Sequence, residues 1–233
     1  LAPIANFGLD AAKNSDNFLL YSRYLGHTDP VWDERFRWNI GGYCFNDTFE
    51  YDEEAYQELM AFIQRDRTPV TLGSCTSNDR ERFCGMLARI SDRKKYRLVV
   101  GSGWAKTGET LQGSEQLFLM KKPIPHHLIF PHCDAVIHHG GSGTTHSVAR
   151  AGVPQLITPL LLDQPYWAYR VQVLGLGPER VKIAKVSENE LERKIADLVG
   201  NPDYKKNAAT VSGQIKSENG IGNLCDYIER LLP

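Results

Sequence analysis

The sequence lacks any apolar run close to the ~20 residues that a membrane-spanning helix needs. It also opens without the basic stretch and apolar core of a secretory signal peptide. Cysteine is scarce: the five cysteines are odd in number, scattered, and form no Cys-x-x-Cys pair. A disulfide framework or a structural zinc site is therefore not expected. We expect a cytoplasmic chain that makes at most peripheral contact with a membrane.

A surplus of charge of either sign is also missing. Lysine and arginine number 27 against 28 aspartates and glutamates, which gives a formal net charge of −1. Basic clusters such as Arg93-Lys94-Lys95 are short, so no long-range field would attract nucleic acid, and we expect no nucleic-acid partner. The 42% hydrophobic and 24% charged content suits one or two folded domains rather than a disordered chain.

Apolar runs alternate with helical patterns along the chain, which predicts a parallel sheet covered by helices on both faces. Residues 1 to about 64 are aromatic-rich and indicate an irregular linker with one helix from Glu53 to Arg65. The strands are expected at Pro69 to Leu72, Tyr96 to Val100, Leu117 to Met120, Ala135 to His138, Gln155 to Thr158 and Val181 to Ile183. The helices after the linker are expected at Asn78 to Ser91, His127 to Phe130, Thr144 to Ala151, Gln164 to Leu174, Glu188 to Val199 and Gly222 to Leu232.

The fold class is therefore a doubly wound, Rossmann-like α/β sheet, in which ligands bind beyond the carboxyl ends of the strands. One helix should end at Gly152, a natural C-cap, because Pro154 follows it.

A glycine-rich loop follows the expected strand 135–138 and is the most informative part of the sequence. It reads His138-His139-Gly140-Gly141-Ser142-Gly143-Thr144-Thr145. Glycine lets the backbone approach phosphate oxygens closely, and the first amides of the following helix favour negative charge. A Walker loop is excluded because no lysine follows Gly143, and a dinucleotide fingerprint because His146 stands where a small residue is needed. The loop predicts a pyrophosphate site, although an ordinary turn with a threonine cap has the same pattern.

Residues 138–177 resemble the nucleotide-sugar glycosyltransferases of family 1, which have the two-domain GT-B fold. The likeness is to bacterial antibiotic and rhamnolipid glycosyltransferases and to sterol glucosyltransferases. It lies in the glycine-rich loop, then Arg150-Ala151-Gly152-Val153-Pro154-Gln155, Pro159, Asp163-Gln164-Pro165-Tyr166-Trp167, Arg170-Val171 and Leu174-Gly175-Leu176-Gly177. Weaker similarities lie in Asn39 to Tyr43, Pro69 to Ser74 and Pro125 to Pro131.

The resemblance implies that the chain is the C-terminal, donor-binding half of such an enzyme. Residues 1–65 would be an interdomain linker and a remnant of the N-terminal acceptor domain, and residues 66–233 the donor-binding domain. The acceptor domain and the general base would lie outside this chain, so no catalytic residue is assigned and the isolated half is expected to be inactive. The start at Leu1 without methionine also suggests a truncated chain.

The resemblance also implies a role for individual residues. The donor pyrophosphate would contact His139, Gly141, Ser142, Gly143, Thr144 and Ser74. The donor sugar would contact Asp163 and Gln164, because a carboxylate and an amide can together bind adjacent hydroxyls. The nucleoside would contact Pro123, Ile124, His126 and Ser147. No metal site and no cofactor are expected; the nucleotide sugar is a co-substrate.

Purely structural roles stay open for several of these residues. His139 could be an ordinary loop histidine, and Asp163 the N-cap of a helix. His138 is expected to be structural, because successive side chains of a strand point to opposite faces. Plant-type relatives carry a tryptophan where Pro123 stands and a ribose-binding glutamate where Ser147 stands, so UDP and dTDP remain equal candidates.

The implied activity is inverting, metal-independent transfer of a hexose from UDP- or dTDP-hexose to the hydroxyl of an apolar, small-molecule or lipid acceptor. The implied partners are the nucleotide-sugar donor, the N-terminal domain in cis or in trans, and that acceptor. Two other functions remain open: a binding module that holds a nucleotide sugar without catalysis, and a sugar-nucleotide epimerase of related fold.

Overall fold

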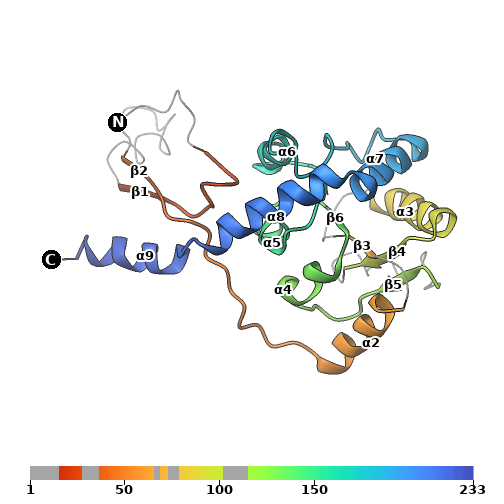
Figure 1. Cartoon of the computed structure of the whole chain (residues 1–233), viewed down its shortest axis with the longest axis horizontal. Helices are drawn as coiled ribbons and strands as arrows, with labels where there is room; N and C mark the ends of the chain where they lie inside the picture. Colours follow the sequence, from red (N-terminus) through yellow and green to blue (C-terminus); the bar gives the residue numbers. More distant parts are fainter. Residues whose placement is uncertain (1–15, 28–36, 66–68, 73–78, 102–114, 233) are drawn as a thin grey trace, which may run out of the picture.

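A parallel sheet of five strands forms the centre of the molecule (Figure 1). The structure, a computed structural model, describes residues 16–27, 37–65, 69–72, 79–101 and 115–232. The strands follow the spatial order β5-β4-β3-β6-β7, and every neighbouring pair is parallel. They are β3 (Pro69–Leu72), β4 (Arg97–Val100), β5 (Leu117–Leu119), β6 (Ala135–His138) and β7 (Gln155–Ile157). The predicted fold class is confirmed.

The order of the strands creates a switch point between β3 and β6. From β3 the chain builds outward through β4 to β5, then returns to the other side of β3 and builds outward through β6 to β7. Ligands of open α/β sheets bind beyond the strand ends at such a point. The loop that follows β6 is therefore in the position where a ligand is expected.

Helices cover both faces of this sheet. The helical elements of the described chain are α2 (Glu53–Ile63), α3 (Arg80–Lys94), α4 (His126–Ile129), the 3₁₀ turn η2 (Phe130–His132), α5 (Ser142–Ala151), α6 (Gln164–Val173), α7 (Glu188–Gly200), α8 (Pro202–Lys216) and α9 (Gly220–Glu229), of which α9 lies away from the sheet. In β4, Leu98 and Val100 belong to one core cluster with α3 and α7, whereas Val99 belongs to another with α2, α4 and α5. This alternation is what a sheet buried on both faces requires. A third cluster around Trp167 joins α5, α6 and α8.

The end of α5 is the C-cap expected from the sequence. Gly152 has a φ of 75° and a left-handed conformation, and its N–H bonds back to the carbonyl of Ala149 at 3.1 Å. A residue with a Cβ is strained in this conformation. The helix therefore ends where the strand β7 must begin.

Three parts of the fold differ from the sequence-based expectations. Residues 181–183 form no strand; the Val181 N–H donates one hydrogen bond to Ile157 O at 3.0 Å. Helix α8 was not predicted, because its many small and polar residues give a weak helical pattern, and tertiary packing of Ala208, Val211 and Ile215 holds it. The residues taken as irregular linker contain two short parallel strands, β1 (Asp16–Leu19) and β2 (Arg37–Ile40).

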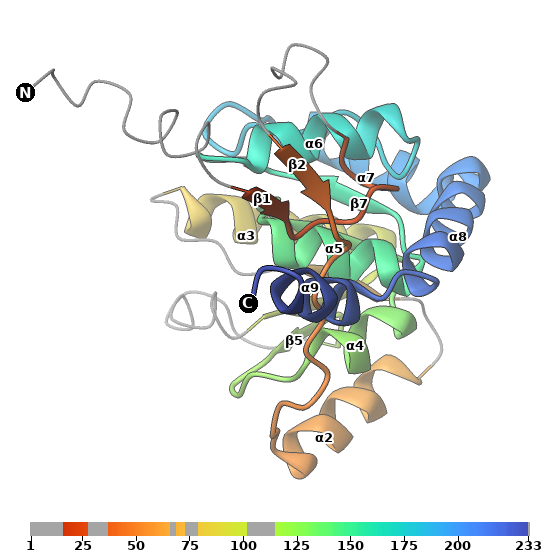
Figure 2. The same ribbon diagram turned by 90° about the vertical axis from the view of Figure 1, so that its left-hand side faces the viewer.

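The strands β1 and β2 lie with α9 at one end of the molecule, away from the central sheet (Figures 1 and 2). The side chain of Asn223 in α9 donates to Gly41 O at 2.7 Å. Gly220 lies so close to Tyr43 that a Cβ would be 2.5 Å from the Tyr43 carbonyl oxygen. The start of α9 therefore fixes the backbone of residues 41–43. No helix in the described part of the chain is both long and apolar enough to cross a bilayer.

Helix α2, although it precedes residue 65, packs on the same core as Val99 and Val136 through Leu59, Phe62 and Ile63. The division of the chain at that residue stays a prediction.

The core and the surface should respond differently to the same truncation. Leu156 of β7 is 0% exposed, whereas Leu162 in the following loop is 86% exposed. We expect Leu156→Ala to lower the free energy of unfolding by about 2 to 5 kcal/mol, because it leaves a cavity in the core. Leu162→Ala should change it by less than about 0.5 kcal/mol. Urea denaturation of both variants measures the difference, and equal losses would contradict the described packing.

Candidate functional site

The loop between β6 and α5 is fixed by a buried histidine. His138 is fully buried; its Nε2 lies 2.8 Å from Gln155 Oε1, and its Nδ1 accepts from the Gly140 N–H at 3.1 Å. Burial lowers the pKa of His138 to about 3, so the ring is neutral. A neutral ring with Nδ1 as acceptor donates through Nε2 to Gln155. The structural role expected for His138 is confirmed.

Gly140 makes the turn that this loop needs. Its φ is +90°, and a Cβ there would lie 2.5 Å from Ile157 Cγ2. A residue other than glycine would be strained and would collide with β7. The turn therefore places the following residues directly above the sheet, at the carboxyl end of β6.

The first turn of α5 is available to an anion. Its N-cap is Gly141, which has no side chain to bond the free amides that begin a helix. These amides and the helix dipole favour negative charge. The half-buried His139 lies over this turn, with its Nε2 2.5 Å from the position of a Cβ on Gly141. The structure thus brings together His139, Gly141, Ser142, Gly143 and Thr144; Ser74 lies outside the described residues.

A second buried histidine ties the start of α5 to the N-terminal segment. Nδ1 of His146 lies 2.7 Å from Ser142 O, and Nε2 accepts from the Ser22 N–H at 3.1 Å. The ring of Tyr43 stacks on the His146 imidazole at 4.3 Å and 18°. Burial lowers the pKa of His146 to about 4, so this ring is also neutral.

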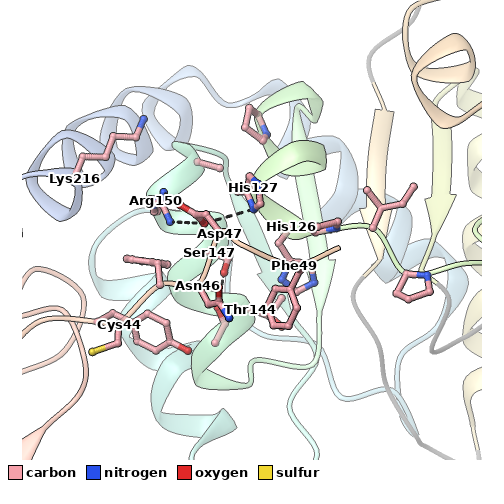
Figure 3. Close-up of a pocket in the computed structure, with 18 of the residues that line it drawn as sticks. Cys44, Asn46, Asp47, Phe49, His126, His127, Thr144, Ser147, Arg150 and Lys216 are labelled. Atoms are coloured by element: carbon pink, nitrogen blue, oxygen red, sulfur yellow. Dashed lines mark hydrogen bonds and ion pairs between the residues drawn. The ribbon is translucent and has the colours of Figure 1, made fainter. Parts of the chain in front are cut away.

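A cavity of about 830 Å³ opens beside this first turn (Figure 3). One of its walls is formed by residues predicted to contact a nucleoside or a pyrophosphate, namely Pro123, Ile124, His126, Gly143, Thr144 and Ser147. His126 is stacked on Phe130 at 4.5 Å, and burial lowers its pKa, with smaller contributions from His127 and His139. The four predicted nucleoside residues therefore share one cavity with the start of α5.

The opposite wall was missed by sequence reasoning. It is the 43–50 segment, which contributes Tyr43, Cys44, Phe45, Asn46, Asp47, Phe49 and Glu50. His127, Arg150 and Lys216 also line the cavity and were not predicted. The signal that the sequence offers is the group of aromatic residues Tyr43, Phe45 and Phe49 in a segment taken as linker.

An ion-paired aspartate connects the two walls. Asp47 Oδ1 accepts from Arg150 Nη1 at 3.0 Å, its Oδ2 bonds the second guanidinium nitrogen, and His127 Nδ1 lies 3.5 Å from Oδ1 (Figure 3). The guanidinium also lies over the Phe45 ring, 4.4 Å from its centroid. The Arg150 hydrogen bond holds the pKa of Asp47 below its usual value.

The two predicted sugar-binding residues lie outside this cavity, at the start of α6. The buried Gln164 uses its Oε1 to accept from the N–H groups of Leu160 at 2.7 Å and Leu161 at 3.2 Å. The exposed Asp163 accepts from Trp167 Nε1 at 2.7 Å. Both side chains thus have structural bonds, and their contact with a sugar stays a prediction. They nevertheless lie near the glycine-rich loop, since Gln164 packs against Gly140.

The described residues include no group of three or more histidine, cysteine, aspartate or glutamate side chains placed to hold a metal ion. Three features of the described site favour an anion: the start of α5, the His139 ring and the cations that line the cavity. An apolar wall of proline, isoleucine and phenylalanine lies next to them.

Part of the chain matches a known protein family, and nearly all of it aligns with a longer relative. Residues 119–226 match the family model described as "Erythromycin biosynthesis protein CIII-like, C-terminal domain". The chain is 29% identical over 226 residues to a sterol 3-beta-glucosyltransferase of Arabidopsis thaliana, which covers 96% of this chain and 34% of that protein. The chain thus spans about a third of the length of this relative.

Solved structures share the fold. The glycosyltransferase of kitacinnamycin superposes with a TM-score of 0.74 at 21% identity, over 94% of this chain and 55% of that one. The glycosyltransferase VinC, crystallised in complex with dTDP, gives a TM-score of 0.60 at 23% identity, over 72% of this chain and 43% of that one. At these identities the likeness shows the fold alone.

The buried histidines predict a loss of stability in mild acid. The folded-state pKa of His146 is about 4 against 6.5 for the free side chain, and that of His138 is about 3. Between these values the unfolded chain binds more protons, so stability falls as pH falls from about 6.5 to about 4, by up to about 1.4 kcal/mol per pH unit and per histidine.

Urea denaturation between pH 7 and 4.5 tests this, because the paired carboxylates with lowered pKa values reduce stability only from about pH 5 downward, at the lower end of that window. His146→Gln should flatten part of the pH dependence, and the exposed His132→Gln should leave it unchanged. A wild-type stability that is constant from pH 7 to 4.5 would contradict the assignment of two neutral buried rings.

Proposed function

Because residues 119–226 match the family model described as "Erythromycin biosynthesis protein CIII-like, C-terminal domain", we propose that this chain binds the activated sugar donor of a glycosyl transfer. The donor is UDP- or dTDP-hexose. The general base and the acceptor site belong to a second domain, in cis or in trans, and the isolated chain transfers no sugar. We also propose that the reaction takes place in the cytoplasm.

One observation carries this proposal: an uncapped helix start and an imidazole lie at the switch point of the sheet, beside a cavity. The first turn of α5 and His139 provide donors for a diphosphate. The cavity of about 830 Å³ falls within the range of small-molecule sites and begins at Gly143 and Thr144. A nucleoside diphosphate can thus place its phosphates on the turn and its nucleoside in the cavity.

The proposed reaction is a direct displacement that inverts the anomeric carbon. The acceptor hydroxyl attacks this carbon and loses its proton to the base, while the bond to the β-phosphate oxygen breaks. The nucleoside diphosphate leaves with additional negative charge. The amides of Ser142, Gly143 and Thr144, together with His139, stabilise this charge, so the proposal needs no metal ion.

The identities of donor and acceptor rest on relatives. VinC binds dTDP, and its fold covers 72% of this chain, which supports a nucleoside diphosphate in the corresponding position. The Arabidopsis relative is a sterol 3-beta-glucosyltransferase. We therefore propose an apolar acceptor that carries a hydroxyl group.

Loss of the imidazole over the helix start should weaken nucleotide binding. We expect His139→Ala to reduce the affinity for UDP or dTDP about tenfold to a hundredfold, because one hydrogen bond to a charged phosphate is lost. Isothermal titration calorimetry measures this. His132→Ala removes an exposed histidine that does not line the cavity and is the matched control.

An unchanged affinity in His139→Ala would refute the diphosphate role of this histidine. If the wild-type chain binds the sugar nucleotide but transfers no sugar when an acceptor domain is supplied, the non-catalytic binding module replaces the proposal.

The aspartate at the start of α6 should discriminate between nucleotide and sugar nucleotide. We expect Asp163→Asn to weaken UDP-glucose or dTDP-glucose about tenfold, and free UDP or dTDP far less, because the lost charge would face the sugar hydroxyls. Asparagine keeps an acceptor for Trp167 Nε1, so the fold is preserved. Calorimetry with the four ligands tests it, and equal losses for conjugate and free nucleotide would count against sugar contact.

A further inference from the structure

The 43–50 segment is an ordered wall of the cavity rather than a loose connection. Tyr43 stacks on His146, Phe45 lies under the Arg150 guanidinium, and Asp47 forms a two-point ion pair with the same arginine. At the start of this segment, the backbone of Gly220 packs closely against the Tyr43 carbonyl. A functional group on this segment is therefore held at a defined place in the cavity.

The cavity-facing residues of α5 set the direction in which a nucleotide would lie. Thr144, Ser147 and Arg150 follow one another at intervals of three residues along one face of the helix, and all line the cavity. The phosphate site is at the Thr144 end. Since the ribose joins the diphosphate to the base, a bound nucleotide would place its ribose beside Ser147 and Arg150, about 5 to 9 Å along the helix.

Asp47 is the charged acceptor at this point (Figure 3). The Ser147 hydroxyl donates to Gly143 O at 2.8 Å, so it offers a ligand only an acceptor, and an uncharged one. Asp47 is ionised, and Arg150 and His127 orient its carboxylate from two sides. A carboxylate has about four acceptor positions. Arg150 uses two of those of Asp47 and His127 one, which leaves one position for a ligand hydroxyl.

We propose that Asp47 accepts a hydrogen bond from the ribose 2′-hydroxyl of the donor, and that it thereby selects a ribonucleoside diphosphate over a 2′-deoxyribonucleoside diphosphate. A carboxylate on the 2′-hydroxyl is a common way in which nucleotide sites identify ribose. Here it comes from a segment 103 residues away from its arginine in the sequence. The inference rests on the proposed function, because it assumes that the nucleoside occupies this cavity.

Glu50 is the other carboxylate of the cavity wall. Both Asp47 and Glu50 are exposed, but no ion pair or hydrogen bond between Glu50 and another described side chain orients it. Ordering such a side chain on a ligand costs conformational entropy that Asp47 has already lost. The assignment therefore goes to Asp47.

Calorimetric titration of the full chain with UDP and with 2′-deoxyuridine diphosphate tests the inference. The wild-type chain should bind UDP about tenfold to a hundredfold more tightly, the effect of one hydrogen bond to a charged group. Asp47→Asn should lose most of this preference by weakening UDP, while its affinity for the deoxy ligand stays within about threefold of wild type. Asp134→Asn, at an aspartate that pairs with Lys205 outside the cavity, is the matched control and should keep the preference.

Two results would overturn the inference. The wild-type chain could bind both ligands equally, which needs no variant to establish. Alternatively, Asp47→Asn could weaken both ligands equally, which would show that Asp47 only holds the 43–50 segment in place. If the wild-type chain binds neither UDP, 2′-deoxyuridine diphosphate nor dTDP, the proposed function itself fails, and this outcome is distinct from the other two.

Discussion

The short connection from β6 to α5 is the constraint on which the rest of the site depends. It must leave the sheet, turn sharply and begin a helix within a few residues, and it must do so without a side chain that caps the helix. Two neutral, buried imidazoles make this possible. His138 accepts a hydrogen bond from the Gly140 N–H, and His146 is hydrogen-bonded to the carbonyl of Ser142. Both rings are neutral because burial disfavours their charged forms. The two histidines thus form hydrogen bonds with polar groups of the turn, and the first amides of α5 remain for a ligand.

The charge of Asp47 in the cavity wall is compensated by its neighbours. Asp47 faces Arg150 and His127, while the neutral His126 is stacked against Phe130. Such an arrangement spares the protein the cost of an isolated charge beside an apolar wall. The attraction of the cavity for an anion then comes chiefly from the helix start and from the exposed Lys216.

The sequence predicted what depends on local pattern. Hydrophobic periodicity and backbone preference predict the strands 69–72 and 135–138, helix α6 and the cap at Gly152. The structure confirms these elements. The four residues that the resemblance assigned to the nucleoside do line one cavity, whereas their contact with a nucleoside stays a prediction. What was missed depends on long-range contacts: α8 is held by packing, and the 43–50 segment acquires its place only through partners such as Arg150 and Gly220. No pattern within either segment specifies these partners.

The contact between Gly220 and Tyr43 has a consequence for the order of events during synthesis. The 43–50 segment leaves the ribosome early, yet the backbone that positions it belongs to α9, at residues 220–229. Translation adds residues one at a time, so the earlier segments wait for their distant partners. The nascent chain can thus form its sheet and helix start first, whereas one wall of the cavity is fixed only after residues 220–229 have been made.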